Sequence, residues 1–134
     1  MGKSIAKRLV EAILLTGALT VVGCAGLGSP VTVKSSEEGK RVVHVKVSSF
    51  KFEPNNIRVP EAGPLTLALE NIADIEHNIT IKTSKGQILK SVDLAPGHTI
   101  SITVDLPDTG KYEFYCDKLF HASLGMKGQI QVGP

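Results

Sequence analysis

Apolar residues recur at every second position through the chain beyond residue 40, in short runs bounded by Gly, Pro, Asn and Asp. This two-residue period predicts β-strands that bury one face and leave the other in water. Seven or eight such strands fit into residues 41–134, with no internal repeat. The pattern therefore predicts an all-β fold, a Greek-key two-sheet β-sandwich. The clearest runs are Val43 to Val47, Leu65 to Leu69, Ile79 with Ile81, Ile100 to Val104, Tyr112 to Cys116, and Ile130 with Val132.

The first 23 residues have the organisation of a signal peptide. Three cations precede an apolar stretch, residues 12–22, that is too short to span a bilayer. The sequence VVGC, which ends at Cys24, resembles the lipobox of lipoproteins, in which the Cys carries lipid. We therefore expect an exported protein, in the periplasm or on the outer face of the cytoplasmic membrane, with a lipid anchor at Cys24. The alternative is an ordinary signal peptide cleaved just beyond Cys24.

Composition divides the remainder into a tether and one domain. Residues 24–40 are polar, rich in Ser and Gly and without period, which is typical of a flexible tether. We expect the folded domain to span residues 41–134. The formal charge of +2 arises in the leader, and the remainder is neutral. It lacks the basic surface that nucleic acid binding requires.

Four residues with metal-binding side chains fall at or after strand ends. His77 keeps step with the inward residues of its strand, and Cys116 does the same at the end of another. The chain then turns through His121 to Met126, at intervals of five residues each. Two imidazoles, one thiolate and a weak axial thioether form the ligand set of a blue copper site.

Other interpretations of these residues exist. A single buried Cys is usually inert and a single Met usually fills a core gap, but their joint spacing favours a metal site. Structural zinc normally takes four N or S ligands. A catalytic red copper site, with a carboxylate from Glu76 or Asp117 in place of Met126, remains an alternative. A binuclear copper centre needs a second Cys in the loop, and an immunoglobulin-like disulfide needs a second Cys in the domain. His44 and His98 are expected in solvent.

Several landmark motifs extend over Val42 to Val132. They are FKFEP at residues 50–54, IRVPEAG at 57–63, Asn71, His77-Asn78, YEFYC at 112–116 and GMKG at 125–128. With them the chain resembles the cupredoxins, the type 1 blue copper proteins that include plastocyanin, halocyanin and rusticyanin. The resemblance implies one copper ion, cycling between Cu(I) and Cu(II), on His77, Cys116, His121 and Met126. Asn78 resembles the residue that hydrogen-bonds the Cys loop in the family. Asp117 departs from the hydroxyl residue that commonly follows the ligand Cys.

The resemblance also implies a function. The protein is expected to be a monomeric one-electron carrier, not an enzyme, that exchanges electrons with cytochrome-type, oxidase or reductase partners. Electrons would pass through His121, which is expected at the surface among the apolar residues Leu119, Phe120, Ala122 and Leu124. The alternative is an exported copper-binding or copper-delivery module that uses the same ligands.

Overall fold

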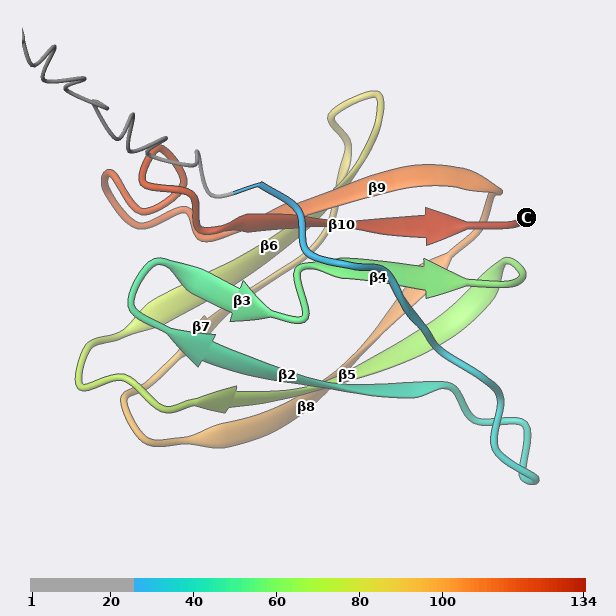
Figure 1. Ribbon diagram of the computed structural model, residues 1–134, viewed down its shortest axis with the longest axis horizontal. Helices are drawn as coiled ribbons and strands as arrows, with labels where there is room; N and C mark the ends of the chain where they lie inside the picture. The colour runs from blue at the N-terminus through green and yellow to red at the C-terminus, as the bar shows by residue number, and fades with distance from the viewer. Residues whose placement is uncertain (1–25) are drawn as a thin grey trace, which may run out of the picture.

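The computed structural model describes residues 26–134, which form a β-sandwich of two mixed sheets (Figure 1). Among these residues every regular element is a strand, and none is a helix long and apolar enough to cross a membrane. The all-β sandwich expected from the alternation is confirmed. Residues 26–134 contain ten strands instead of the expected seven or eight, because β1 and β3 are too short to show a period. They are β1 (Val31–Thr32), β2 (Val42–Ser48), β3 (Lys51–Glu53), β4 (Asn56–Val59), β5 (Gly63–Asn71), β6 (His77–Thr83), β7 (Ile88–Leu94), β8 (Thr99–Leu106), β9 (Gly110–Tyr115) and β10 (Lys127–Val132).

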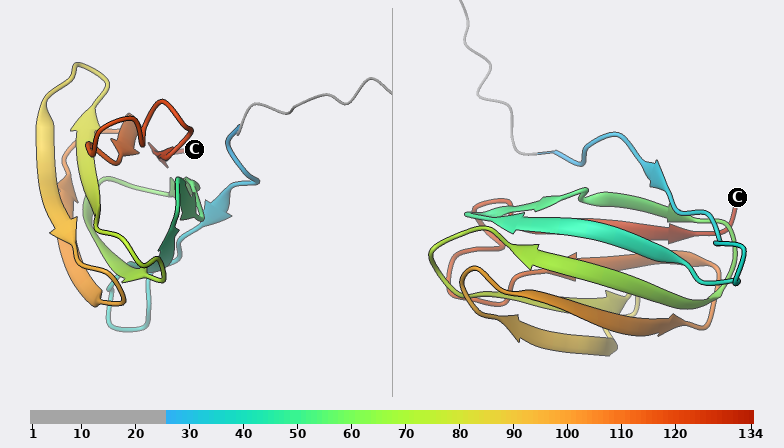
Figure 2. Two further views of the ribbon diagram at one scale, coloured as in Figure 1. Left: turned by 90° about the vertical axis from the view of Figure 1, so that its left-hand side faces the viewer. Right: turned by 90° about the horizontal axis from the view of Figure 1, so that it is seen from below.

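Strand neighbours in the sheets are often distant in sequence. One sheet has the order β1-β4-β10-β9-β6-β7 and the other the order β3-β2-β5-β8. β10 lies parallel to β4 and antiparallel to β9, and β2 lies parallel to β5. Such crossovers between the two layers are typical of Greek-key sandwiches. Figure 2 shows the two layers facing each other.

The core follows the alternation along the chain. In β2, Val43, Val45 and Val47 are buried while the residues between them are exposed. Phe52 of β3 and Phe114 of β9 meet edge to face across the sandwich, with ring centroids 5.3 Å apart. Both sheets are therefore held by interdigitated side chains, and the frame that carries the strand ends is rigid.

The segment expected to be a tether is partly folded. Val31–Thr32 pair in parallel with β4, and the next residue, Val33, is buried against the core. The side-chain amide of Asn55 binds the residues just before β1: its Oδ1 accepts a hydrogen bond from the Gly28 N–H at 2.7 Å. The expected domain boundary at residue 41 is therefore wrong. Three residues, VTV at 31–33, are too few to reveal a two-residue period. The leader and Cys24 lie outside the described residues.

Four loops gather at one end of the sandwich, on the left in Figure 1. They are the connections β2–β3, β5–β6, β7–β8 and β9–β10. The buried amide of Asn71 joins two of these loops, because its Nδ2 donates to the carbonyls of Ile75 at 2.9 Å and Ala95 at 3.2 Å. This end of the molecule is therefore built from several fixed backbones, and it carries the cluster described next.

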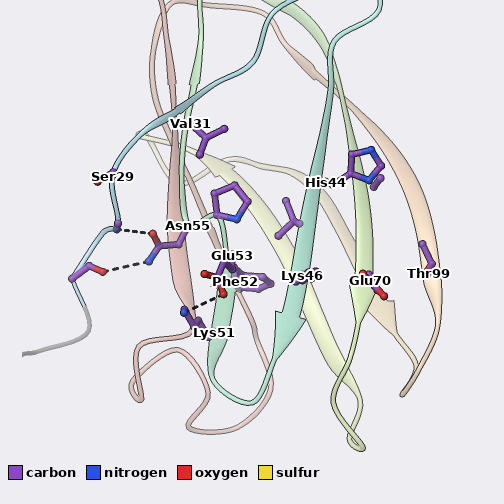
Figure 3. A pocket seen from close by; sticks show the side chains of 15 residues that line it. Ser29, Val31, His44, Lys46, Lys51, Phe52, Glu53, Asn55, Glu70 and Thr99 are labelled. Carbon is purple, nitrogen blue, oxygen red and sulfur yellow. Dashed lines mark hydrogen bonds and ion pairs between the residues drawn. The ribbon is translucent and has the colours of Figure 1, made fainter.

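A groove of about 950 Å³ lies elsewhere, on the outer face of the smaller sheet between β2 and residues 26–31 (Figure 3). His44, Lys46 and Glu70 line it. His44 is exposed, as expected from its position in β2, and so is His98 in the β7–β8 loop. The residues expected to bind metal do not line this groove.

Candidate metal centre

His77, Cys116 and His121 meet at the loop end of the sandwich. One ligand atom from each lies within 4.8 Å of the others. His77 is the first residue of β6, Cys116 follows the last residue of β9, and His121 stands in the β9–β10 loop. His77 and Cys116 are fully buried and His121 is half-buried. The structure thus brings together the three residues that strand parity and spacing suggested.

Hydrogen bonds within the β9–β10 loop fix its shape. The Cys116 N–H donates to the Met126 carbonyl at 3.1 Å, which closes the base of the loop. The Met126 N–H donates to the His121 carbonyl at 3.0 Å. Gly125 has a φ of 100°, a conformation that side chains disfavour, so a glycine suits the turn into Met126. Met126 is fully buried at the base of this loop.

The two ring nitrogens of His77 are buried and have no hydrogen-bond partner among the described residues. Buried polar atoms nearly always have a partner, so an unpartnered imidazole beside a thiol suits a metal ligand. Burial lowers the pKa of His77, and the nearby imidazole of His121 lowers it further. A neutral imidazole is the form that binds metal. The donor set of two imidazoles and a thiol, with a thioether nearby, therefore fits a copper ion.

The sulfur of Cys116 has two polar contacts. It accepts a hydrogen bond from the backbone N–H of Asn78 at 3.3 Å and lies 3.4 Å from Nδ1 of His121. An N–H directed at sulfur stabilises the thiolate, which is the form that binds metal. Asn78 therefore contacts the expected ligand, but through its backbone.

The side chain of Asn78 does not follow the expectation that it bonds the Cys loop directly. Its Nδ2 donates to Asp93 Oδ1 at 3.1 Å and to Ser91 Oγ at 3.3 Å, both on β7. Its Oδ1 accepts from the Thr80 hydroxyl at 2.8 Å. The physical reason is register: Asn78 lies directly opposite Asp93 in the β6–β7 pair. Asp117, expected to be its altered partner, is exposed and makes none of these bonds.

Lys118 of the loop pairs with two carboxylates. Its Nζ lies 2.6 Å from Glu76 Oε1 and 3.0 Å from Asp93 Oδ1. These hydrogen bonds raise the pKa of Lys118 above its usual value, the bond to Glu76 most of all. The bonds from Asn78 and then Lys118 hold the pKa of Asp93 below its usual value. The sequence reasoning did not single out Lys118 or Asp93 as site residues.

An apolar surface surrounds His121. Leu119 and Phe120 are 78% and 70% exposed, Leu124 is also exposed, and Ala122 is half-buried. Three further exposed residues at this end of the molecule, from the β2–β3 and β5–β6 loops, are Phe50, Ile72 and Ile75.

Phe50 was missed as a site residue, although its motif was noted. Its ring packs edge-on against His121, with centroids 5.0 Å apart. Phe50 and Phe120 are the two described residues other than glycine with positive φ, at 62° and 66°. Such backbone conformations are uncommon and concentrate at functional sites. The sequence did contain a signal for Phe50: it lies in the turn Ser49-Phe50 between two apolar runs, where a large apolar residue is seldom needed for folding.

The composition of the cluster bears on the alternative of a red copper site with a carboxylate ligand. Among the described residues the group within ligand distance contains no Asp or Glu. Glu76 is paired with Lys118 and Asp117 is exposed. His44 and His98 do not belong to the group either.

Comparisons with known proteins agree with this geometry. A family model described as "Cupredoxin-like domain" matches residues 17–132. Plastocyanin of Daucus carota is 30% identical over 89 residues, which cover 60% of this chain and 86% of that protein. A multicopper oxidase of Staphylococcus epidermidis is 31% identical over 111 residues, which cover 66% of this chain. The chain spans about a quarter of the length of that oxidase.

A solved structure shares the fold. Reduced auracyanin from Roseiflexus castenholzii superposes with a TM-score of 0.62 at 21% identity, over 69% of this chain and 97% of that one. At this level of identity the likeness concerns the fold.

Proposed function

The chain belongs to the cupredoxin-like domain family, as its landmark motifs predict, and we propose that it is a type 1 copper electron-transfer protein. The observation that carries this function is the cluster of His77, Cys116 and His121, whose ligand atoms lie within 4.8 Å of one another. Met126, buried at the base of the same loop, would supply a weak thioether ligand. These four residues would hold one copper ion.

Bound copper would supply a one-electron Cu(II)/Cu(I) couple. The chain would contribute a site whose residues are held in place by the fold. Cys116 is fixed by the Asn78 N–H and by the bond of its own N–H to Met126. His77 begins a strand that is buried between β7 and β9. Ligands held in this way need little rearrangement when the charge changes, and a small rearrangement lowers the barrier to electron transfer.

The apolar surface around His121 would receive redox partners. Small interfaces of this kind suit the brief encounters of electron carriers. Leu119→Ser should slow electron exchange with a c-type cytochrome without changing the visible spectrum. Ile88→Ser is a matched control, because Ile88 is an exposed apolar residue at the other end of β7 from Leu94 and the metal cluster. Equal rates for both variants would contradict this docking surface.

The direct test of function is to add one equivalent of Cu(II) to the metal-free full-length protein. We expect an intense visible band from thiolate-to-copper charge transfer that reductant bleaches and oxidant restores. Voltammetry should show a reversible one-electron couple. Colourless binding would overturn the proposal. Rapid transfer of copper to a chelator at matched concentration would instead support the alternative, a copper-delivery module.

Export and lipid anchoring at Cys24 are a further part of the proposal. Their support is the cationic and apolar leader followed by VVGC. When the protein is expressed in bacteria with its own leader, we expect it to partition into detergent and to incorporate labelled lipid. Cys24→Ala should abolish both. A wild-type product that is soluble and unlabelled would favour simple secretion.

A further inference from the structure

We propose that Lys118 is a positioning residue that clamps the β9–β10 loop to the strand carrying His77. Its ammonium bonds Glu76 Oε1 at 2.6 Å and Asp93 Oδ1 at 3.0 Å. Glu76 directly precedes His77, and Asp93 lies on β7. One side chain therefore connects the loop between Cys116 and His121 to the residue that precedes β6 and to β7.

The clamp continues to the sulfur of Cys116. The Asp93 oxygen that Lys118 bonds also accepts the Asn78 Nδ2–H at 3.1 Å. The backbone N–H of Asn78 in turn donates to Cys116 Sγ at 3.3 Å. The side chain of Asn78 bonds Ser91, Asp93 and Thr80 and makes no direct bond to the loop among the described contacts. The chain from Asn78 through Asp93 to Lys118 makes that connection with three side chains.

Lys118 is also tied to His121 through the backbone. Its carbonyl accepts the His121 N–H at 3.0 Å. A shift of Lys118 therefore moves the residue that carries the second imidazole. Among the described residues the His121 side chain has one hydrogen-bonding contact, to Cys116 Sγ, and its ring packs against Phe50. No strand of the sandwich holds the ring by a hydrogen bond in the described part of the chain, so its position depends on these loops.

The energetics favour a local role over a global one. Lys118 is partly exposed, and Glu76 and Asp93 are 51% and 60% exposed in their side chains. Ion pairs at such positions contribute little to the stability of a whole domain. Three groups bonded in sequence nevertheless restrict a loop that has few apolar contacts of its own, because Leu119, Phe120 and Leu124 face solvent.

The experiment compares Lys118→Met, which keeps the aliphatic stem, with Lys118→Arg, which keeps the charge. Lys90→Met on β7 is the control, because Lys90 is exposed and has no ion pair in the part of the chain that the structure describes. In the metal-free protein, amide hydrogen exchange at His121 and Met126 should accelerate about five-fold in Lys118→Met. Exchange at the core strands should stay unchanged, and Lys118→Arg should restore most of the protection.

The copper-loaded protein gives an independent measurement. This part rests on the proposed function, so the wild type must first develop the charge-transfer band. With that established, Lys118→Met should release Cu(II) to a chelator several-fold faster and shift the band, whereas Lys118→Arg and Lys90→Met should not. Wild-type loop exchange in Lys118→Met would overturn the clamp. So would an acceleration spread evenly over the core strands. Absence of the charge-transfer band in the wild type would contradict the proposed function. The hydrogen-exchange experiment on the metal-free protein would still test the clamp.

Discussion

The backbone N–H of Asn78 donates to the sulfur of Cys116 at 3.3 Å, although the two residues are 38 positions apart. Asn78 follows His77 on β6, and Cys116 follows the last residue of the neighbouring strand β9. This single bond fixes the thiol relative to the first imidazole. The ligand cluster therefore depends on the pairing of β6 with β9, which the core side chains of the sandwich specify.

Cys116→Ser tests the thiolate. The Asn78 N–H can donate to a hydroxyl as it does to sulfur, so the fold should survive with a loss of about 1–2 kcal/mol in unfolding free energy. The charge-transfer band should vanish, because an alcohol at this position supplies no thiolate. Absorption after addition of Cu(II), together with urea denaturation, measures both effects. A strongly coloured variant would contradict the assignment of Cys116.

The metal-free protein should lose stability as the pH falls below about 6.5. The pKa of His77 in the fold is lowered from 6.5 by burial and then by His121. Between that lowered pKa and 6.5 the unfolded chain binds a proton that the folded chain does not, so unfolding becomes easier as pH falls. Above 6.5 this contribution to stability is complete. Urea denaturation at pH 8 and pH 5.5 measures the difference.

His77→Leu provides the control for this pH dependence. It removes the buried ring whose nitrogens lack partners, so the difference in stability between pH 8 and pH 5.5 should shrink. At pH 8 the variant should equal or exceed the wild type in metal-free stability, by on the order of 1 kcal/mol. An unchanged pH dependence would assign the effect to another group.

Met126→Leu separates the axial ligand from the packing of the core. Met126 is fully buried, and Leu has a similar volume, so the unfolding free energy should change by less than about 1.5 kcal/mol. Copper should remain bound by the other three residues, and the reduction potential should rise because the site becomes less polar. Voltammetry and copper analysis check both outcomes. Loss of copper would mean that Met126 does more than a weak axial ligand.

Residue patterns predicted the sandwich and the three clustered residues for a physical reason. In a strand the side of a residue follows from its parity, so His77 and Cys116 could be placed inward without coordinates. The same reasoning placed His44 outward. Strand parity alone does not reach His121 and Met126, which lie in the loop after Cys116; their intervals of five residues each and the ligand set of a blue copper site suggested them.

Contacts across strands and short elements escaped this reasoning. A hairpin centred on Lys85-Gly86 would place Asn78 opposite Asp93, as the structure does. The sequence alone does not show that this strand pairing is continuous, because the register of β6 against β7 shifts by one residue between Ile81 and Lys82. The bonds of Lys118 depend on the path of an irregular loop, which no period describes. β1 is two residues long and was missed for the same reason.

Asp117→Asn should raise the reduction potential. The carboxylate follows the thiolate ligand directly and is exposed, and it enters no ion pair among the residues that the structure describes. Negative charge favours Cu(II) over Cu(I), so its removal favours reduction. A carboxylate ~8 Å from the metal contributes on the order of 1–2 kcal/mol at an effective dielectric of about 20 to 40, and solvent and salt remove much of it. The rise should therefore be on the order of tens of millivolts and should shrink at high ionic strength.

Variants of two other acidic residues near the site, and of one distant acidic residue as a control, test whether the effect of Asp117→Asn is specific. Glu76→Gln should have a smaller effect than Asp117→Asn, because Lys118 already offsets the charge of Glu76 from 2.6 Å. Asp74→Asn should also shift the potential less, since Asp74 lies three residues before His77. Asp105→Asn is the control: Asp105 is exposed near the far end of β8, about 20 Å along the strand from Thr99. Voltammetry of the four variants at low and high salt tests this order. A potential that is unchanged or lowered in Asp117→Asn would show that this carboxylate does not act on the metal.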